Sequence, residues 1–480
     1  MAALIFALPG RRSPSNPFAG TTSALALLVA VGTVAVSLPA LADDAQVAIG
    51  SDDAPANADN RTSGDDKTAT WYSLHIQGTY TSQGHPKFPS AIPNGPQSML
   101  SKRQISETGD ATLFAGVRLG DVELYFNPEM DQGYGNSNTF GVAGYVSGEA
   151  YKVGEYYPYY RTPRMFGRYV LGLGGEDVKV EDGPNQIAGS HDADNITFTF
   201  GKFGVTDIFD NNAYAHDPRA DFLNWSLIEM GAFDYAAEAW GYTYGGAVEW
   251  NQGSWSWRGG VFDLSRQPNA KYLERGFGQY QAVTEVEKRY EISGNPGKVH
   301  LLSYVSSGKM GRYADAITLA EETRTVASTA QVRRHHLKPG GGINIEQQLV
   351  PDLGAFFRFS QDDDTKESFD FSDIGQSTSG GLSLKGTRWD RPDDIVAIGF
   401  AVNSISKEAR RYFADGGTGV VIGDGSLPGY APEQILESYY KATVVEGLAL
   451  TVDYQRATNP AYDKVRGPIN VFALRIHAEL

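Results

Sequence analysis

Cysteine is absent from all 480 residues. This excludes a disulfide-linked fold and any metal site with thiolate ligands. An excess of basic charge is also absent: the formal net charge is −16, so no basic face is available to neutralise phosphates and we expect no nucleic-acid partner. The sequence lacks G-x-S-x-G, H-E-x-x-H and P-loop motifs as well. We therefore expect no catalytic residues, cofactor or metal, and a protein that is not an enzyme.

Long hydrophobic runs are scarce, since the mean hydropathy is −0.33 and only Ser23–Ala42 is apolar enough to resemble a membrane helix. Arg11 and Arg12 precede this run, and Ala40-Leu41-Ala42 ends it. A basic segment, an apolar segment and an A-x-A site predict a secretory signal peptide over residues 1–42, cleaved after Ala42. The alternative is a single membrane anchor. Residues 43–70 have almost no large apolar side chain, which predicts a flexible acidic periplasmic lead-in.

From Trp71 to the end, hydrophobicity alternates with a period of two, which is typical of strands. In Asn470–Leu480, for example, Phe472, Leu474 and Ile476 share one face. Such runs number about sixteen, each of roughly ten residues, the length that crosses a bilayer at a steep tilt. The pattern predicts an all-β fold: one transmembrane β-barrel of about 16 antiparallel strands over residues 71–480.

The connections between these runs alternate between short and long. Short turns occur at Gly120-Asp121, Asn251–Ser254 and Glu446-Gly447, whereas Met130–Thr162 and Gly204–Ala232 are long. Outer-membrane barrels alternate in this way, because their periplasmic turns are tight and their extracellular loops are long. Only the connection Gly175–Asp194 is longer than a periplasmic turn should be.

Aromatic residues gather near the ends of the predicted strands. They suit interfacial girdles, where an amphipathic ring lies at the level of the lipid headgroups. The alternative is the ordinary preference of aromatic residues for strands. The aromatics assigned to girdles include Trp71, Tyr72, Tyr156–Tyr160, Tyr242, Tyr244, Trp250, Trp255, Trp257, Tyr439 and Tyr440.

Parity along each strand predicts which side chains face the lumen. Leu124 and Phe126 face lipid, for example, so Glu123 and Asn127 point inward. Charged groups around one ring can orient polar solutes and replace the hydration of sugar hydroxyls, or they can simply solvate the wall. The predicted pore-lining or constriction residues are Arg118, Glu123, Asn127, Glu129, Asp131, Arg161, Arg164, Arg168, Glu249, Glu346, Arg358 and Arg475, with Asp453 and His477 also placed in the lumen.

Glu129 and the segment Arg161–Arg168 rank highest, because they flank the long loop Asp131–Tyr160. This loop is rich in Gly, Asn and Tyr, which suits a polar loop folded into the lumen, but an extracellular lid is an equally good interpretation. His216-Asp217-Pro218-Arg219 is interpreted as a turn before a short helix, Asp221–Ile228, rather than as a catalytic or metal site. The basic segment Arg333–Lys338 is expected to be a surface loop that contacts lipopolysaccharide phosphates.

Three stretches resemble one known family. They are Phe126–Phe166, Phe198–Asn251 and Ile435–Tyr462, and the most specific motifs are GKF-x-x-x-DIFD at Gly201–Asp210 and YAHDPR-x-x-FLNW at Tyr214–Trp225. The chain thus resembles the carbohydrate-selective porins of the OprB family over nearly all of its mature length. The resemblance implies a sixteen-stranded outer-membrane barrel and diffusion of mono- and oligosaccharides without chemical turnover. Leu480 departs from the aromatic residue that usually ends such barrels.

We therefore expect a porin of the Gram-negative outer membrane that passes small carbohydrates. The expected partners are outer-membrane lipid and lipopolysaccharide, small carbohydrates and the insertion machinery, and the barrel is a monomer or a homotrimer. The alternatives are a general diffusion porin without sugar selectivity, a non-transporting receptor or adhesin, and a barrel enzyme. The last would need a nucleophile and a base at the outer rim, which the sequence does not offer.

Overall fold

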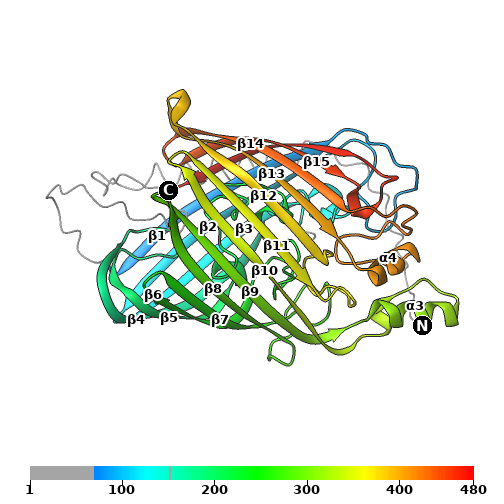
Figure 1. Cartoon of the computed structure of the whole chain (residues 1–480), viewed down its shortest axis with the longest axis horizontal. Coiled ribbons are helices and arrows are strands. Elements are labelled where there is room, and N and C mark those ends of the chain that lie inside the picture. The colour runs from blue at the N-terminus through cyan, green and yellow to red at the C-terminus, as the bar shows by residue number, and fades with distance from the viewer. Residues whose placement is uncertain (1–69, 151–152) are drawn as a thin grey trace, which may run out of the picture.

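The computed structural model describes residues 70–150 and 153–480, so the predicted signal peptide and nearly all of the lead-in lie outside the described residues. Within them, sixteen strands form one closed antiparallel barrel, in which every strand pairs with its neighbours along the chain and β1 pairs with β16 (Figure 1). The strands are β1 (Tyr72–His85), β2 (Gln104–Leu119), β3 (Val122–Gly133), β4 (Tyr159–Val180), β5 (Gly189–Phe203), β6 (Thr243–Gln252), β7 (Trp255–Asp263), β8 (Tyr280–Ile292), β9 (Asn295–Met310), β10 (Arg334–Val350), β11 (Leu353–Asp362), β12 (Gln376–Gly386), β13 (Arg391–Ser404), β14 (Glu433–Val445), β15 (Leu448–Thr458) and β16 (Ile469–Glu479). The predicted sixteen-stranded barrel is confirmed.

The helices that the structure describes all lie in connections between strands. They are α2 (Trp225–Ile228), α3 (Tyr313–Thr323), α4 (Lys407–Ala414), and the 3₁₀ turns η1 (Asn136–Thr139), η2 (Val205–Asp207), η3 (Thr329–Gln331), η4 (Thr387–Trp389) and η5 (Pro460–Tyr462). Among residues 70–150 and 153–480, no helix is both long and apolar enough to cross a bilayer. Helices α3 and α4 pack together beyond the strands, at the end of the barrel that carries the long connections (Figure 1).

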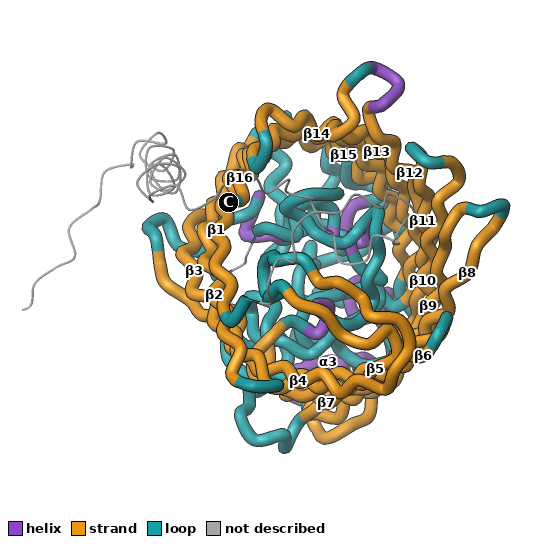
Figure 2. Tube along the Cα trace, turned by 90° about the vertical axis from the view of Figure 1, so that its left-hand side faces the viewer, coloured by secondary structure: helices purple, strands orange, loops and turns teal. Residues whose placement is uncertain are grey.

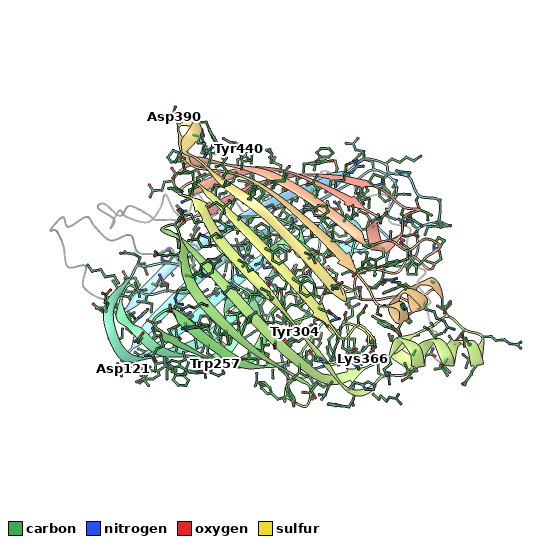
Figure 3. All side chains as sticks on the ribbon, in the orientation of Figure 1. Asp121, Trp257, Tyr304, Lys366, Asp390 and Tyr440 are labelled. Carbon is green, nitrogen blue, oxygen red and sulfur yellow. The ribbon has the colours of Figure 1, made fainter. Side chains whose placement is uncertain are left out.

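The alternating pattern of each strand becomes an apolar outer face and a polar inner face. On β5, Phe198 and Phe200 are exposed outward, while Thr199 is buried inside. A hydrocarbon solvent favours such an outer face, because apolar side chains lose nothing by contacting lipid. Asp121 and Asp390 lie in short turns at one end of the barrel, and Lys366 lies in a long loop toward the other (Figure 3). The short-turn end is the periplasmic one.

Two of the long connections fold into the barrel instead of lying over it (Figure 2). We call them inner loop A, residues 134–150 and 153–158, and inner loop B, residues 204–242. In inner loop A, Val142 and Ala143 are buried, and in inner loop B, Phe209 and Leu227 are. Of the two interpretations of Asp131–Tyr160, the structure therefore favours the inward-folded loop.

Two local predictions are wrong. The helix expected over Asp221–Ile228 covers only Trp225–Ile228, because the Asn224 side chain caps the first turn and accepts a hydrogen bond from the Ser226 N–H. Asp221 instead accepts hydrogen bonds from the His216 and Asp217 N–H groups within the preceding turn.

The basic segment Arg333–Lys338 is not a loop, since β10 begins at Arg334. Its cations face acidic partners. Arg333 pairs with Glu367 at 2.8 Å, Arg334 with Asp315 at 2.6 Å, and buried Lys338 with Asp362 at 2.6 Å. Because these three cations are paired with acidic side chains, they are less available to bind lipopolysaccharide phosphates.

Candidate functional site: a constriction of the lumen

A cluster of charged side chains lies on the inner face of the barrel where β2, β3 and β4 meet inner loop B. We call it the constriction cluster: Asp110 of β2, Glu129 and Asp131 of β3, Arg161 of β4, Glu149 of inner loop A, and Arg219 of inner loop B. All six side chains are buried. Buried charges are tolerated when they pair with opposite charges, and these two arginines and four carboxylates do so.

Arg161 is the centre of the first set of contacts. One of its terminal nitrogens lies 2.7 Å from a Glu129 oxygen, and its Nε donates to Asp131. The Thr112 hydroxyl holds the other Glu129 oxygen at 2.6 Å. The planar guanidinium presents its donors in a fixed fork, so carboxylates on two sides set its orientation.

Arg219 lies between three carboxylates, at 3.4 Å from Glu149 and 3.5 Å from both Asp110 and Glu129. Burial alone would favour the neutral side chain, but the three acids outweigh burial and raise the pKa of Arg219. Arg219 belongs to the His216–Arg219 segment that the sequence interpretation took for a turn. The turn exists, and Arg219 adds a cation to the lumen. The alternation of side chains along strands could not predict this, because it assigns no inward or outward face to a loop residue.

Aromatic rings border the cluster. The Arg161 guanidinium lies 5.1 Å from the centre of the Trp240 ring and 5.6 Å from that of Tyr242, and Arg164 lies 5.1 Å from Tyr242. Tyr242 is buried in the lumen, so its expected place in an interfacial girdle is wrong. Tyr439 is likewise buried on the inner face, whereas Trp250, Trp255 and Trp257 are exposed on the outer face.

A bulge explains why Arg161 and Arg164 share the inner face although they are three residues apart. Glu129 pairs with Arg161 and Asn127 with Arg164, so β4 carries one extra residue between these pairs. Pro163 lies in this bulge, where the missing N–H costs no ladder hydrogen bond. Arg164 pairs with Asp207 of η2 at 2.6 Å.

A cavity of about 360 Å³ opens at the extracellular side of the cluster. Tyr159, Arg161 and Trp240 belong to its lining, and the Trp240 indole N–H donates to the Tyr159 hydroxyl at 3.0 Å. Lys202, Glu238 and Lys271 add charge, and Tyr157, Tyr160 and Tyr272 add aromatic surface. Charged groups beside ring faces provide both hydrogen bonds and apolar contact for a small polar solute.

The remaining predicted residues lie elsewhere on the inner face. Arg118, Glu123, Asn127 and Arg168 are near the periplasmic end, where Arg118 pairs with Glu123 at 2.7 Å. Arg475 donates to the Pro218 and Asp221 carbonyls of inner loop B, so the loop covers it. Asp453 is buried next to Gln455, and His477 lies 3.0 Å from the Thr79 hydroxyl.

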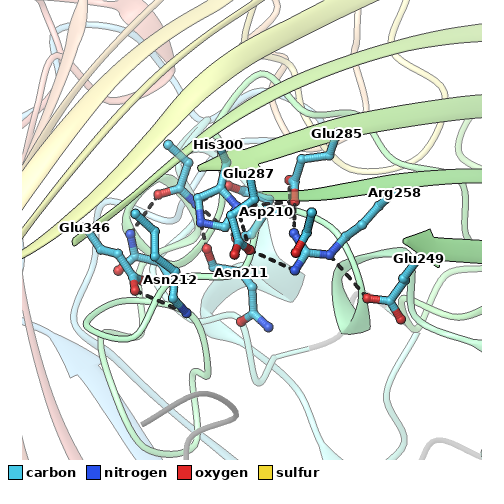
Figure 4. A network of polar contacts seen from close by, with 12 residues as sticks. Asp210, Asn211, Asn212, Glu249, Arg258, Glu285, Glu287, His300 and Glu346 are labelled. Carbon is cyan, nitrogen blue, oxygen red and sulfur yellow. Dashed lines mark hydrogen bonds and ion pairs between the residues drawn. The ribbon is translucent and has the colours of Figure 1, made fainter. Parts of the chain in front are cut away.

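Glu249, Glu346 and Arg358 belong to a second network, which anchors the start of inner loop B to the barrel wall (Figure 4). Asp210 is its centre. Its N–H donates to Glu285 at 2.9 Å, and its side chain accepts from Asn344 at 2.8 Å and from Arg358 at 3.1 Å. Arg358 is 1% exposed, so it holds the loop and does not line an open path.

Arg258 links this network across three strands, at 3.2 Å from Glu249 and 2.8 Å from both Glu285 and Glu287. Sequence reasoning missed Arg258, Glu285 and Glu287. The alternation along β7 could have placed Arg258 on the inner face, because Arg258 follows the outward-facing Trp255 and Trp257. In the described part of the chain, no group of three or more metal-ligating side chains is suitably placed for an ion.

Known proteins resemble this chain in fold and in family. The Pseudomonas putida protein OprB superposes with a TM-score of 0.64 and 17% identity, covering 85% of this chain and 94% of that one. The Acinetobacter baumannii channel DcaP gives a TM-score of 0.45 at 10% identity, covering 85% of this chain and 98% of its own. No curated protein matches the sequence.

The family model described as the carbohydrate-selective porins, OprB family, matches residues 97–480. This range includes the constriction cluster, both inner loops and the last fifteen strands. The chain therefore belongs to the carbohydrate-selective porins of the OprB family.

Proposed function

We propose that this protein is a porin of the Gram-negative outer membrane that lets small carbohydrates diffuse passively through the constriction cluster. One observation carries the proposal: Arg161, which is paired with Glu129, lies 5.1 Å from the centre of the Trp240 ring and 5.6 Å from that of Tyr242. A pyranose has hydroxyls around its rim and apolar C–H faces. Fixed charged donors and acceptors can replace hydroxyl hydration while a ring contacts the sugar face, and weak binding lets the solute leave.

The same arrangement supports passage without chemical turnover. Each carboxylate of the constriction cluster is paired with an arginine, so these side chains offer fixed polar contacts to a passing solute. We further propose export by the signal peptide with cleavage after Ala42, a proposal supported by the charge and hydropathy pattern of residues 1–42.

Current block in planar bilayers tests the function. Mono- and oligosaccharides added to the purified protein should reduce the ion current reversibly. Trp240→Ala should weaken the block about tenfold in half-blocking concentration, as expected for the loss of one stacking face. Trp257→Ala is the matched control, because this indole lies on the outer face and should leave the block unchanged.

The alternatives predict different results. A general diffusion porin would conduct ions but show no sugar block that depends on Trp240. A receptor or adhesin would show no conductance at all. Either result would overturn the proposal.

A further inference from the structure

The turn between β4 and β5 is longer than the other periplasmic turns, and it bends over the mouth of the lumen. Figure 2 looks into this end and shows the β4–β5 hairpin crossing in front of part of the opening. The bend lies at glycines: the pairing of β4 with β5 shifts register around Gly172 and Gly174, and Gly174 and Gly175 have φ of 103° and 93°. Such φ values favour glycine, so the sequence itself specifies the bend.

The tip of this hairpin, residues 181–188, is fixed to the inner wall of the barrel by one buried side chain, while Glu181, Asp182 and Pro184 are exposed. Ile187 is 1% exposed and packs in one cluster with the inward-facing rings of Tyr125 and Phe166. A buried apolar side chain at the tip of a periplasmic turn needs an explanation, because such turns ordinarily face water.

Four strands supply side chains that hold the tip. Arg118 of β2 donates to the carbonyls of Ile187 and Ala188, each at 3.0 Å, and Arg168 of β4 donates to the Asn185 carbonyl at 3.0 Å. Asn127 of β3 contacts the Asn185 side chain at 2.8 Å. Hydrogen bonds from charged donors are stronger than neutral ones, so the two arginines fix the tip where it lies.

Two more contacts come from β1: His75 is 3.2 Å from Asp182, and the Ser73 hydroxyl donates to the Gly183 carbonyl at 3.3 Å. The holding residues lie further along the strands that form the constriction cluster. Arg161 and Arg168 are separated by roughly 15–20 Å along the barrel axis, given the rise per residue and the tilt of such strands. The tip therefore lies at a different level of the barrel from the constriction cluster.

We propose that residues 181–188 form a second constriction, which limits the size of solutes at the periplasmic exit independently of the constriction cluster. Arg118, Arg168 and Ile187 are its positioning residues. A solute that has passed Arg161 and Trp240 must still pass between the tip and the opposite wall.

Replacing the tip tests this directly. Val180 and Gly189 are the last paired residues, so Asn-Gly in place of residues 181–188 would join them by an ordinary two-residue hairpin turn. If the two constrictions resist ion flow about equally, removing one should raise the single-channel conductance about twofold. The largest uncharged polyethylene glycol that enters should also become larger.

The matched control shortens another turn at the same end. The turn between β12 and β13, residues 387–390, contains no buried residue. Asn-Gly in its place should therefore change neither the single-channel conductance nor the size limit for polyethylene glycol. If removal of the tip prevents folding, the Ile187→Gly variant is measured instead. It should raise the conductance and the size limit by a smaller factor. Heat-modifiable migration in gels shows which variants are folded.

Unchanged conductance and size limit in a folded tip variant would overturn the proposal. Sugar block distinguishes this failure from failure of the proposed function. Block depends on Trp240 and should persist when the tip is removed, whereas the size limit depends on the tip and is measured with polymers that are not sugars.

Discussion

Arg219 shows how much a single loop residue can contribute to a pore. It brings one positive charge to Asp110, Glu129 and Glu149, of which Glu129 also contacts Arg161. Arg219→Gln should therefore shift the channel toward cations, seen as a reversal-potential change of tens of millivolts in a salt gradient, because the uncompensated carboxylates attract them.

Arg456→Gln is the control for this change. Arg456 lies outside the lumen on β15 and contacts Asn470 at 3.2 Å, so its removal should leave the reversal potential unaltered. A shift of equal size in both variants would mean that Arg219 has no special effect on ions in the lumen.

The pair Arg164–Asp207 gives a pH-dependent prediction. Burial opposes ionisation of Asp207, but Arg164 outweighs burial and holds the pKa of Asp207 below its ordinary value. The stabilisation is therefore complete above the unfolded pKa, about 4, and is lost as the pH falls through the lower folded value. The stability difference between wild type and Asp207→Asn should be constant near neutral pH and shrink in acid.

Thermal unfolding in detergent between about pH 7 and pH 3 measures this difference. An equal difference at all pH values would show that Asp207 acts through packing and not through its charge.

At the scale of elements, β14 holds both inner loops with two glutamates. Glu433 accepts from the N–H groups of Ala143 and Gly144 at 2.9 and 2.7 Å, and Glu437 accepts from those of Leu223 and Asn224 at 2.5 and 2.9 Å. Glu437→Ala leaves two buried N–H groups without a partner, at a cost of about 2–4 kcal/mol.

We therefore expect Glu437→Ala to loosen inner loop B and to give a noisier channel of higher conductance in single-channel recordings. Gln434→Ala is the control, because Gln434 is exposed on the outer face of the same strand. A quiet Glu437→Ala channel of wild-type conductance would show that the loop keeps its place without this contact.

Sequence reasoning was successful for the barrel and less so for its interior, and these elements show why. Strand parity and loop length are local properties, so β16 and the short turn at Glu446-Gly447 could be predicted from a few residues. Whether a long loop enters the lumen depends on contacts such as Glu437 with Leu223, 214 residues apart. No local pattern encodes such a contact, and the bulge beside Pro163 likewise appears only when β3 and β4 are paired.

At the scale of the whole molecule, fifteen strand pairs join neighbours in sequence and one pair, β1 with β16, closes the barrel. Thr79 and His477 are register partners at this junction. In a chain without cysteine, Thr79→Cys with His477→Cys would introduce the sole disulfide, and it would close a loop of nearly the whole barrel. Oxidation should stabilise the fold by about 6 kcal/mol, the value that the chain-entropy relation gives for a closed loop of about 400 residues.

The control places the same bond in a hairpin, at the register partners Thr443 and Ala449 of β14 and β15. Its short loop removes much less entropy from the unfolded chain, so its effect on urea unfolding should be clearly smaller. Equal stabilisation by both bonds would indicate that the unfolded chain already keeps the ends of the barrel together.

The hydrogen bonds between the barrel wall and inner loop B limit how this loop can be transferred to another barrel. Inner loop B is held by the contacts of Asp210 with β8, β10 and β11 and by Glu437 of β14. Its conformation therefore depends partly on strands that lie far away in the sequence. A graft of residues 204–242 alone into another barrel would carry Arg219 and Trp240 but leave their supports behind. The transferable unit is the loop together with Glu285, Asn344, Arg358 and Glu437.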